Sequence, residues 1–456
     1  MSAEADAVAP SGPRAPWWRR RGDLLAVLAL ILASFVFTTD QVTEHDMMSP
    51  IDEYQYVGYY ANVADHGIVR RGEAMPFFAR KYMVCHGVRN IPEMPPNPAA
   101  CRKPNSVGYP IEGGTTADLY TPLYFGATRV LAQPLIWAGV DFVSAGRLVG
   151  GFWLALGAVF LYLAMRRGRV PIPVAVGFNL VMIGSLAAYW GNTYISTDAT
   201  ALACGGLAAL LAMHAIDGGR KSLLLLPLAG ALATLFKLQN FIGFVAAALV
   251  LVLAAAYGAS QQAGGASSRV RAFVTDRRTL SAVATLVASI VAQGCWIALR
   301  SALAVGEQPK FGFGAPLEGK NLVVELGNFL PALGGGALAP FATGPATLPV
   351  YAVATALAIG GCVGLSLSAG LPAMRRFVGV STVLVAVVAA PALAIVVGFV
   401  ENNYVPLPSR YAHSLLPWAL LSAALLVGRP RPWVRYTLLG LGVVTWCLAL
   451  MMGEVG

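Results

Sequence analysis

Residues 17–39 read WWRRRGDLLAVLALILASFVFTT. Three consecutive arginines, Arg19 to Arg21, precede the apolar run Leu24–Thr39. A helix that crosses a bilayer needs about 20 mostly apolar residues, and basic residues beside it favour the cytoplasmic side. No small-residue cleavage site follows the run, as it would in a signal peptide. We therefore interpret this stretch as a signal anchor, with the tail 1–22 in the cytoplasm and the following chain outside.

Charged residues are scarce throughout the chain. They make up 12% of the 456 residues, against about 25% in a typical soluble domain, and 57% of the residues are hydrophobic. A soluble globule needs more charge to cover its surface, so the composition excludes a soluble enzyme, a disordered chain and a coiled coil. The net charge of +10 comes in short basic groups between apolar runs, which is typical of membrane topology rather than nucleic-acid binding. The composition predicts an all-α polytopic membrane protein with no nucleic-acid partner.

The alternation of apolar runs and basic groups predicts about eleven transmembrane helices in a single domain, 23–456. Basic groups such as 166–169 fall in the loops assigned to the cytoplasm. Two longer loops, 40–141 and 305–347, fall on the outer side. We find no internal repeat of the kind that indicates an inverted-repeat transporter. The predicted spans are 24–39, 142–165, 172–190, 199–216, 222–236, 240–257, 280–304, 348–369, 377–400, 412–428 and 436–452.

One apolar stretch, Leu119–Val140, is ambiguous because Pro122, Arg129 and Pro134 interrupt it. If it spanned the membrane, the basic group 166–169 would lie outside, against the positive-inside rule. We therefore expect an interfacial or re-entrant segment on the outer face.

The six cysteines divide by their surroundings. Cys85 and Cys101 lie in the first outer loop, which faces an oxidising compartment, so we expect them to form a disulfide. Two free thiols are the alternative. The other four lie in apolar runs and are expected to be small buried residues. No Cys/His spacing indicates a metal site.

Two adjacent carboxylates, Asp52 and Glu53, follow the first predicted span closely. One of them could act as a general base while the other orients a partner. A structural interpretation also fits: Ser49 would cap a helix over 50–65, with Pro50 in its first turn and the acids favouring the helix dipole. The two interpretations are compatible.

Further polar residues interrupt the apolar pattern at the outer ends of predicted spans. Lys237 and Arg410 are cations placed against the charge bias, and Arg147 faces outward one turn into the second span. An anionic lipid phosphate would pair with such cations, although a snorkelling lysine is the alternative for Lys237. The structural alternatives are that Asp198 caps the helix that follows it and that Asp118 is an ordinary polar loop residue. Carboxylates and cations on one rim suit a lipid-phosphate substrate and a hydroxyl to be deprotonated.

Several segments together resemble the GT-C superfamily of integral membrane glycosyltransferases. Asp52-Glu53-Tyr54 matches the acidic motif of the first outer loop, and Thr121-Pro122-Leu123-Tyr124 resembles a Pro-Pro-Leu-Tyr segment, with Thr121 in place of the first proline. Arg147-Leu148 resembles the beginning of the helix that follows. The segment Ser409-Arg410-Tyr411 to Leu416-Pro417 resembles a late Arg-Tyr…Pro motif. The resemblance covers residues 24–428 or so.

The resemblance implies transfer of a sugar from a polyprenyl-phosphate donor to an acceptor hydroxyl, with inversion, in cell-envelope assembly. Asp52 would be the general base, with Glu53 as second choice. The donor phosphate would bind Lys237, Arg410, Tyr411 and Arg147. Substrate contacts are expected from Asp118, Tyr120, Tyr124, Asn192, Asp198 and Gln239.

No metal site is predicted, although Asp52 and Asp198 could share a divalent cation. The acceptor could be a glycan, a lipid or a protein, and the active site would face outward from the plasma (inner) membrane. The alternatives are a secondary transporter, whose charges usually lie near the bilayer midplane, and a non-catalytic envelope-assembly scaffold.

Overall fold

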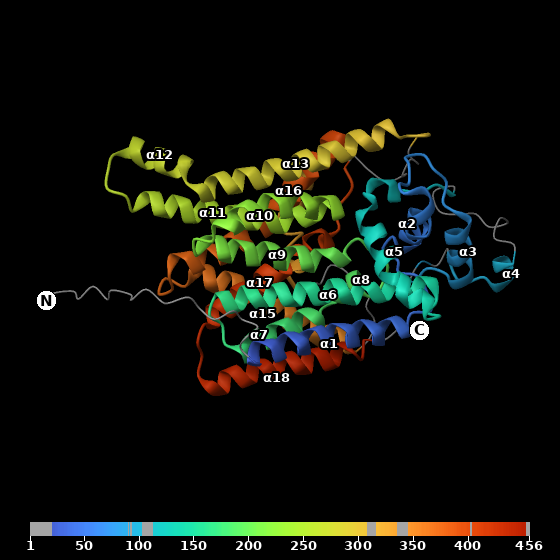
Figure 1. The fold of residues 1–456 in the computed structure, drawn as a ribbon, viewed down its shortest axis with the longest axis horizontal. Coiled ribbons are helices and arrows are strands. Elements are labelled where there is room, and N and C mark those ends of the chain that lie inside the picture. Colours follow the sequence, from blue (N-terminus) through green and yellow to red (C-terminus); the bar gives the residue numbers. More distant parts are fainter. Residues whose placement is uncertain are drawn as a thin grey trace.

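The computed structural model describes residues 21–89, 91, 94–102, 113–307, 316–334, 345–401 and 404–452. These residues form a bundle of long helices with a smaller helical cap at one end (Figure 1). The only bridges of β type among them are isolated, Met48 with Val88 and Ala74 with Gly114, so the fold is all-helical as predicted. The predicted tail lies almost entirely outside the described residues, and so do 308–315 and 335–344 of the second outer loop.

Seven helices in the described residues are long and apolar enough to cross a membrane. An eighth span results if α7 (Ile172–Ile183) and α8 (Leu186–Asn192), which meet at a bend of 56°, count as one. The composition and these helices define a multi-pass helical membrane protein. The seven helices are α1 (Arg21–Thr43), α6 (Phe142–Arg167), α9 (Ala199–Ile216), α11 (Phe241–Ser260), α13 (Arg277–Ala302), α15 (Thr347–Leu367) and α16 (Ala373–Glu401).

The predicted count of eleven is not confirmed. All eleven apolar runs are helical, but three of the helices fall short in length or apolarity: α10 (Arg220–Phe236), α17 (Leu416–Val427) and α18 (Pro432–Ala449). α10 has 17 residues with a proline inside, and α17 has only 12 because a 3₁₀ helix, η8 (Ser409–Leu415), takes up the start of its run. The three still lie among the others, since α10 packs on α13, α17 on α15 and α18 on α7.

Basic groups from different loops meet at the end of the bundle where α1 begins. Arg166 at the end of α6 pairs with Asp23 at 2.7 Å, and Arg167 pairs with Asp217, which follows α9, also at 2.7 Å. The cap formed by the first loop lies at the opposite end (Figure 1). The predicted alternation of spans places the basic loops and the first long loop at opposite ends of the bundle, as observed. The side of the membrane that each end faces stays a prediction.

The cap contains α2 (Glu53–His66), α3 (Phe77–His86), α4 (Pro98–Cys101), η4 (Ala117–Leu119) and α5 (Pro122–Trp137). Its core is aromatic, with Tyr59 stacked on Phe125 at 4.2 Å between ring centres. The ambiguous stretch forms α5, which has 16 residues and packs on α2 and α6. Val130 and Trp137 on this helix are 72% and 78% exposed, as expected of an apolar face that meets lipid at the interface.

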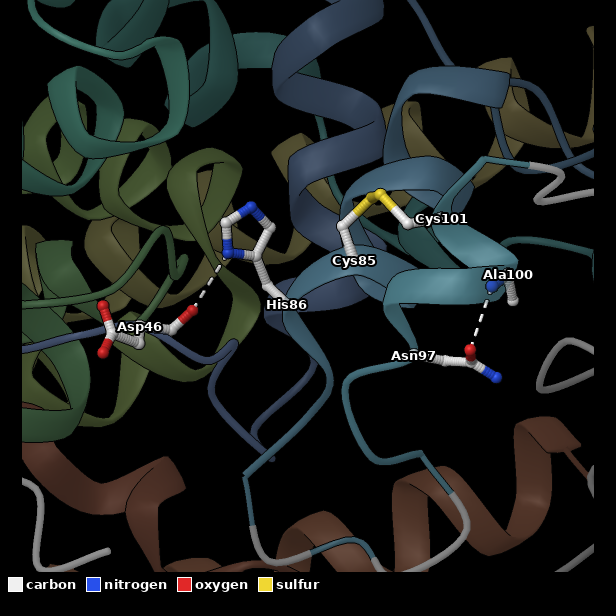
Figure 2. Close-up of a disulfide and its surroundings, with 6 residues drawn as sticks. All are labelled: Asp46, Cys85, His86, Asn97, Ala100 and Cys101. Atoms are coloured by element: carbon white, nitrogen blue, oxygen red, sulfur yellow. Dashed lines mark hydrogen bonds between the residues drawn. A yellow bond between two sulfur atoms is a disulfide. The ribbon is translucent and has the colours of Figure 1, made fainter.

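A disulfide joins α3 to α4, between Cys85 and Cys101 (Figure 2). Neighbouring hydrogen bonds hold the same region: the Asn97 side chain caps α4 through the Ala100 N–H at 2.9 Å, and His86 Nδ1 contacts the Asp46 carbonyl. Cys204 and Cys362 are buried as predicted. Cys295 and Cys447 are exposed instead, because they lie on outward faces of α13 and α18.

Removing the disulfide is expected to destabilise the cap. In the chain-entropy description, closing a loop of this length stabilises the fold by about 3 kcal/mol. Cys85→Ser should therefore lower the midpoint of thermal unfolding, and adding a reductant should change the variant no further. Cys295→Ser, at a free exposed cysteine, is the matched control and should unfold like the wild type. An unchanged midpoint for Cys85→Ser would contradict the expectation.

Candidate functional site

Four breaks between helices converge at the cap end of the bundle. They are the turn at Asp52 before α2, the segment 193–198 between α8 and α9, the segment 237–240 between α10 and α11, and η8 before α17. The 3₁₀ helix η5 (Leu238–Asn240) packs on η8, and η8 also packs on α9 and α11. Each polar side chain of the site therefore projects from a helix end rather than from the middle of a span.

A network of four charged side chains joins these breaks. Arg410 Nη2 donates to Asp52 Oδ2 at 2.9 Å, and Arg410 Nε lies 3.5 Å from Asp198 Oδ2. Lys237 Nζ donates to the other oxygen of Asp198. Lys237 and Asp198 are almost fully buried, whereas the Asp52 side chain is 39% exposed. Burial alone would raise the pKa of Asp198, but Lys237 and Arg410 outweigh it and hold that pKa below its usual value.

One aromatic ring lies beside both cations. Tyr411 lies 5.4 Å from Lys237 Nζ and 5.7 Å from the Arg410 guanidinium, measured to the ring centre. Beside them the Tyr56 hydroxyl donates to the Tyr120 hydroxyl at 3.0 Å. Burial raises the pKa values of Tyr56 and Tyr120 well above their usual range, so both remain neutral hydrogen-bonding groups.

The second carboxylate, Glu53, occupies a different environment. Both its oxygens accept from Arg147, Nε to Oε1 and Nη2 to Oε2, each at 2.9 Å, and both residues are buried. The Ser49 and Ile195 N–H groups donate to the same carboxylate at 2.8 and 3.0 Å. The remaining donors of Arg147 reach backbone carbonyls of the 45–47 segment. This pair ties α2, α6 and the 193–198 segment together beneath Asp52.

The helix after these acids begins later than predicted. α2 starts at Glu53 with Asp52 as its N-cap, and the Asp52 side chain makes no capping hydrogen bond. Asp52 has φ 59° and ψ 4°, in the left-handed region that aspartate tolerates better than most residues. Ser49 accepts from the Ile51 N–H instead of capping the helix. The left-handed turn directs Asp52 towards Arg410 while its neighbour Glu53 points inward.

Two other predicted site residues, Tyr124 and Asn192, hydrogen-bond to the backbone of the 193–198 segment or of the helices beside it. The Tyr124 hydroxyl accepts from the Ser196 N–H at 3.0 Å, and the Asn192 amide donates to the Gly150 and Ala199 carbonyls. In the described part of the chain, the buried Gln239 Oε1 has no hydrogen-bond partner.

Asp118 does not join the network. It pairs with Arg300 at the end of α13 at 2.7 Å, and Trp296 on the same helix donates to the Leu119 carbonyl. Burial raises the pKa of Asp118 above its usual value even though Arg300 opposes the shift. Asp118 thus links α13 to the cap.

The sequence prediction assigns no role to His413, which is buried beside the network. Its side chain is 1% exposed, and within the described residues neither ring nitrogen has a hydrogen-bond partner. Residues three apart eclipse one another in a 3₁₀ helix, so His413 lies on the same side of η8 as Arg410. The Arg-x-x-His spacing places both side chains on one side only in a 3₁₀ helix, and the sequence does not show that this segment is 3₁₀.

The structure gives no support to a divalent cation between Asp52 and Asp198. Arg410 bridges these two carboxylates. Among the described residues, no group of three or more His, Cys, Asp or Glu side chains is placed to hold a metal ion.

No protein-family model matches the chain, and no curated protein matches it significantly. Among solved structures, the crystal structure of ArnT from Cupriavidus metallidurans in the apo state is similar, with 16% sequence identity and a TM-score of 0.37. The alignment covers 88% of this chain and 76% of that one. At this score and identity the similarity does not assign the chain to a family.

Proposed function

We propose that this protein is a membrane glycosyltransferase of the GT-C type, which moves a sugar from a polyprenyl-phosphate donor to an acceptor hydroxyl. The observation that carries the proposal is the network at the cap end, where two buried or nearly buried cations meet a partly exposed carboxylate. Charged groups gathered at one end of a membrane helix bundle suit a substrate with a lipid tail and an anionic head. The site would face outward from the plasma membrane.

Lys237 and Arg410 are the proposed partners of the donor phosphate. Arg410 presents its donors in a fixed fork that fits phosphate oxygens, and Lys237 has ammonium protons beyond the one given to Asp198. A phosphate would take the place of Asp52 on Arg410, while Asp198 keeps both cations in position. Fixed cations of this kind stabilise the charge on the leaving phosphate without a metal ion.

Asp52 is the proposed general base. It would accept the proton of the acceptor hydroxyl, whose oxygen forms the new bond to the anomeric carbon. The bond from that carbon to the phosphate oxygen breaks, and polyprenyl phosphate leaves. One displacement of this kind inverts the anomeric centre. In this proposal Glu53 and Arg147 are positioning residues, since the two form an ion pair with each other.

The proposal is tested by supplying the protein, reconstituted in sealed proteoliposomes, with a panel of radiolabelled polyprenyl-phosphate sugars. The expected result is release of polyprenyl phosphate together with transfer of label to a glycan, lipid or protein acceptor. Label that crosses the membrane still attached to an unchanged donor would instead indicate a transporter. An inert panel in the presence of envelope acceptors would contradict the proposal.

Lys237→Met should weaken donor use in this assay. Loss of a hydrogen bond to a charged group costs about 1.5–3 kcal/mol, so we expect the donor KM to rise by roughly 10- to 100-fold. The control is Lys320→Met, because the Lys320 side chain is 75% exposed and pairs with Glu318 rather than with a residue of the network. Equal donor KM values for the two variants would remove Lys237 from the phosphate site.

A further inference from the structure

The second outer loop contacts the segment that leads to Arg410. Its described part contains the short helix α14 (Gly319–Glu325) and the residues that follow it. Glu325 Oε1 accepts from the Tyr404 hydroxyl at 2.7 Å and from the Leu407 N–H at 3.0 Å. Asn328 donates to Glu325 Oε2 at 2.7 Å and also to the Leu407 carbonyl. Both backbone groups of Leu407 are thus held by the loop.

Glu325 is an unusual residue to find in this position. It is 1% exposed, and its partners in the described part of the chain are neutral: a phenol, an amide and a backbone N–H. Burying a carboxylate is costly unless its oxygens are satisfied by hydrogen bonds. Three donors converge on it here, so the loop and the 404–407 segment hold one another in a defined register.

The position of Leu407 determines where η8 begins, and with it the position of Arg410. Pro408 follows with its restricted φ, and its carbonyl accepts from the Tyr411 N–H at 3.1 Å in the first turn of η8. Another part of the loop, the 3₁₀ helix η6 (Pro331–Gly334), packs directly on η8. A shift of the 404–407 segment would therefore move the Arg410 guanidinium away from both carboxylates that it bridges.

We infer that Glu325 is a positioning residue for Arg410, and that the second loop holds the phosphate-binding arginine in place. This inference rests on the proposed function for its catalytic consequence, because Arg410 is there a ligand of the donor phosphate. Glu325 itself touches neither the donor nor the acceptor in this account.

The first test is a double-mutant cycle on sugar transfer. Glu325→Gln keeps the size of the side chain but turns one acceptor into a donor, and about a tenfold loss in kcat/KM for the donor is expected. In an Arg410→Lys background the same substitution should change kcat/KM by less than about twofold, because effects that share one target are not additive. Tyr404→Phe should reproduce part of the loss. Glu318→Gln, an exposed acid at the start of α14, is the control.

The second test does not depend on activity. Hydrogen–deuterium exchange of segment 404–413 should become faster in Glu325→Gln, whereas exchange of α2 should remain that of the wild type. Equal losses of transfer in both Arg410 backgrounds, or unchanged exchange over 404–413, would overturn the inference. If the wild type transfers no sugar at all, the proposed function fails, and the exchange measurement alone still decides whether Glu325 positions Arg410.

Discussion

Asp52→Asn is expected to lower the rate of sugar transfer by roughly 10²–10⁴-fold, the usual contribution of a positioned general base. Asparagine has nearly the same shape but cannot accept the acceptor's proton. The protein should remain folded, because the Asp52 side chain is 39% exposed and Arg410 still contacts Asp198. The measurement is single-turnover transfer from the donor identified in the panel, together with the unfolding midpoint.

Asp65→Asn is the matched control for this substitution. Asp65 is exposed near the end of α2, the helix that Asp52 precedes, so its loss should leave transfer unchanged. Transfer by Asp52→Asn at the wild-type rate would exclude Asp52 as the base. An equal fall for both variants would indicate a general effect of charge on the cap.

Arg147→Met should destabilise the fold by about 3–5 kcal/mol, because it leaves the Glu53 carboxylate buried without its cation. Replacing both partners, as in Glu53→Leu with Arg147→Met, should cost less than the single change, since no uncompensated charge then remains. Unfolding of the purified variants measures both effects.

The exposed pair Arg70 and Glu73 provides the comparison for the buried pair. Its ion pair is 3.5 Å long and the Arg70 side chain is half exposed, so Arg70→Met should cost no more than about 1 kcal/mol. If Arg147→Met left stability unchanged but abolished donor binding, the positioning role of the Glu53–Arg147 pair would be wrong and Arg147 would belong to the phosphate site.

Much of the fold follows from the length of the apolar runs. Each predicted run forms a helix, and basic residues far apart in sequence, such as Arg166 and Arg375, gather at one end, where Arg375 reaches the Gly168 carbonyl. The count of spans was less predictable. Hydropathy alone does not show that η8 takes up the first turns of the run at 412–428 or that the run at 172–190 bends by 56°.

Most of the charged site could also be located from the sequence. Asp52, Asp198, Lys237 and Arg410 each lie at a helix end on the same side of the alternation, and the structure brings them together. Their pairing could not be predicted. Adjacent acids have opposite surroundings, because the left-handed backbone at Asp52 turns it outward while Glu53 meets an arginine 94 residues away.

The contacts of Asp118 and of the segment before Arg410 could not be predicted from the sequence either. Asp118 pairs with Arg300, 182 residues later, and Glu325 reaches the segment before Arg410 from a loop that carried no motif. Both contacts depend on how loops fold over the ends of helices. Neither composition nor periodicity contains this information.

Equilibrium binding of radiolabelled polyprenyl phosphate, measured in nanodiscs beside the transfer rate, tests the central claim most directly. Asp52 shares Arg410 with the proposed phosphate, so Asp52→Asn should bind polyprenyl phosphate at least as tightly as the wild type while losing transfer. Binding that weakens in step with transfer, or transfer that survives the substitution, would contradict an account in which Asp52 is the base and Arg410 holds the phosphate.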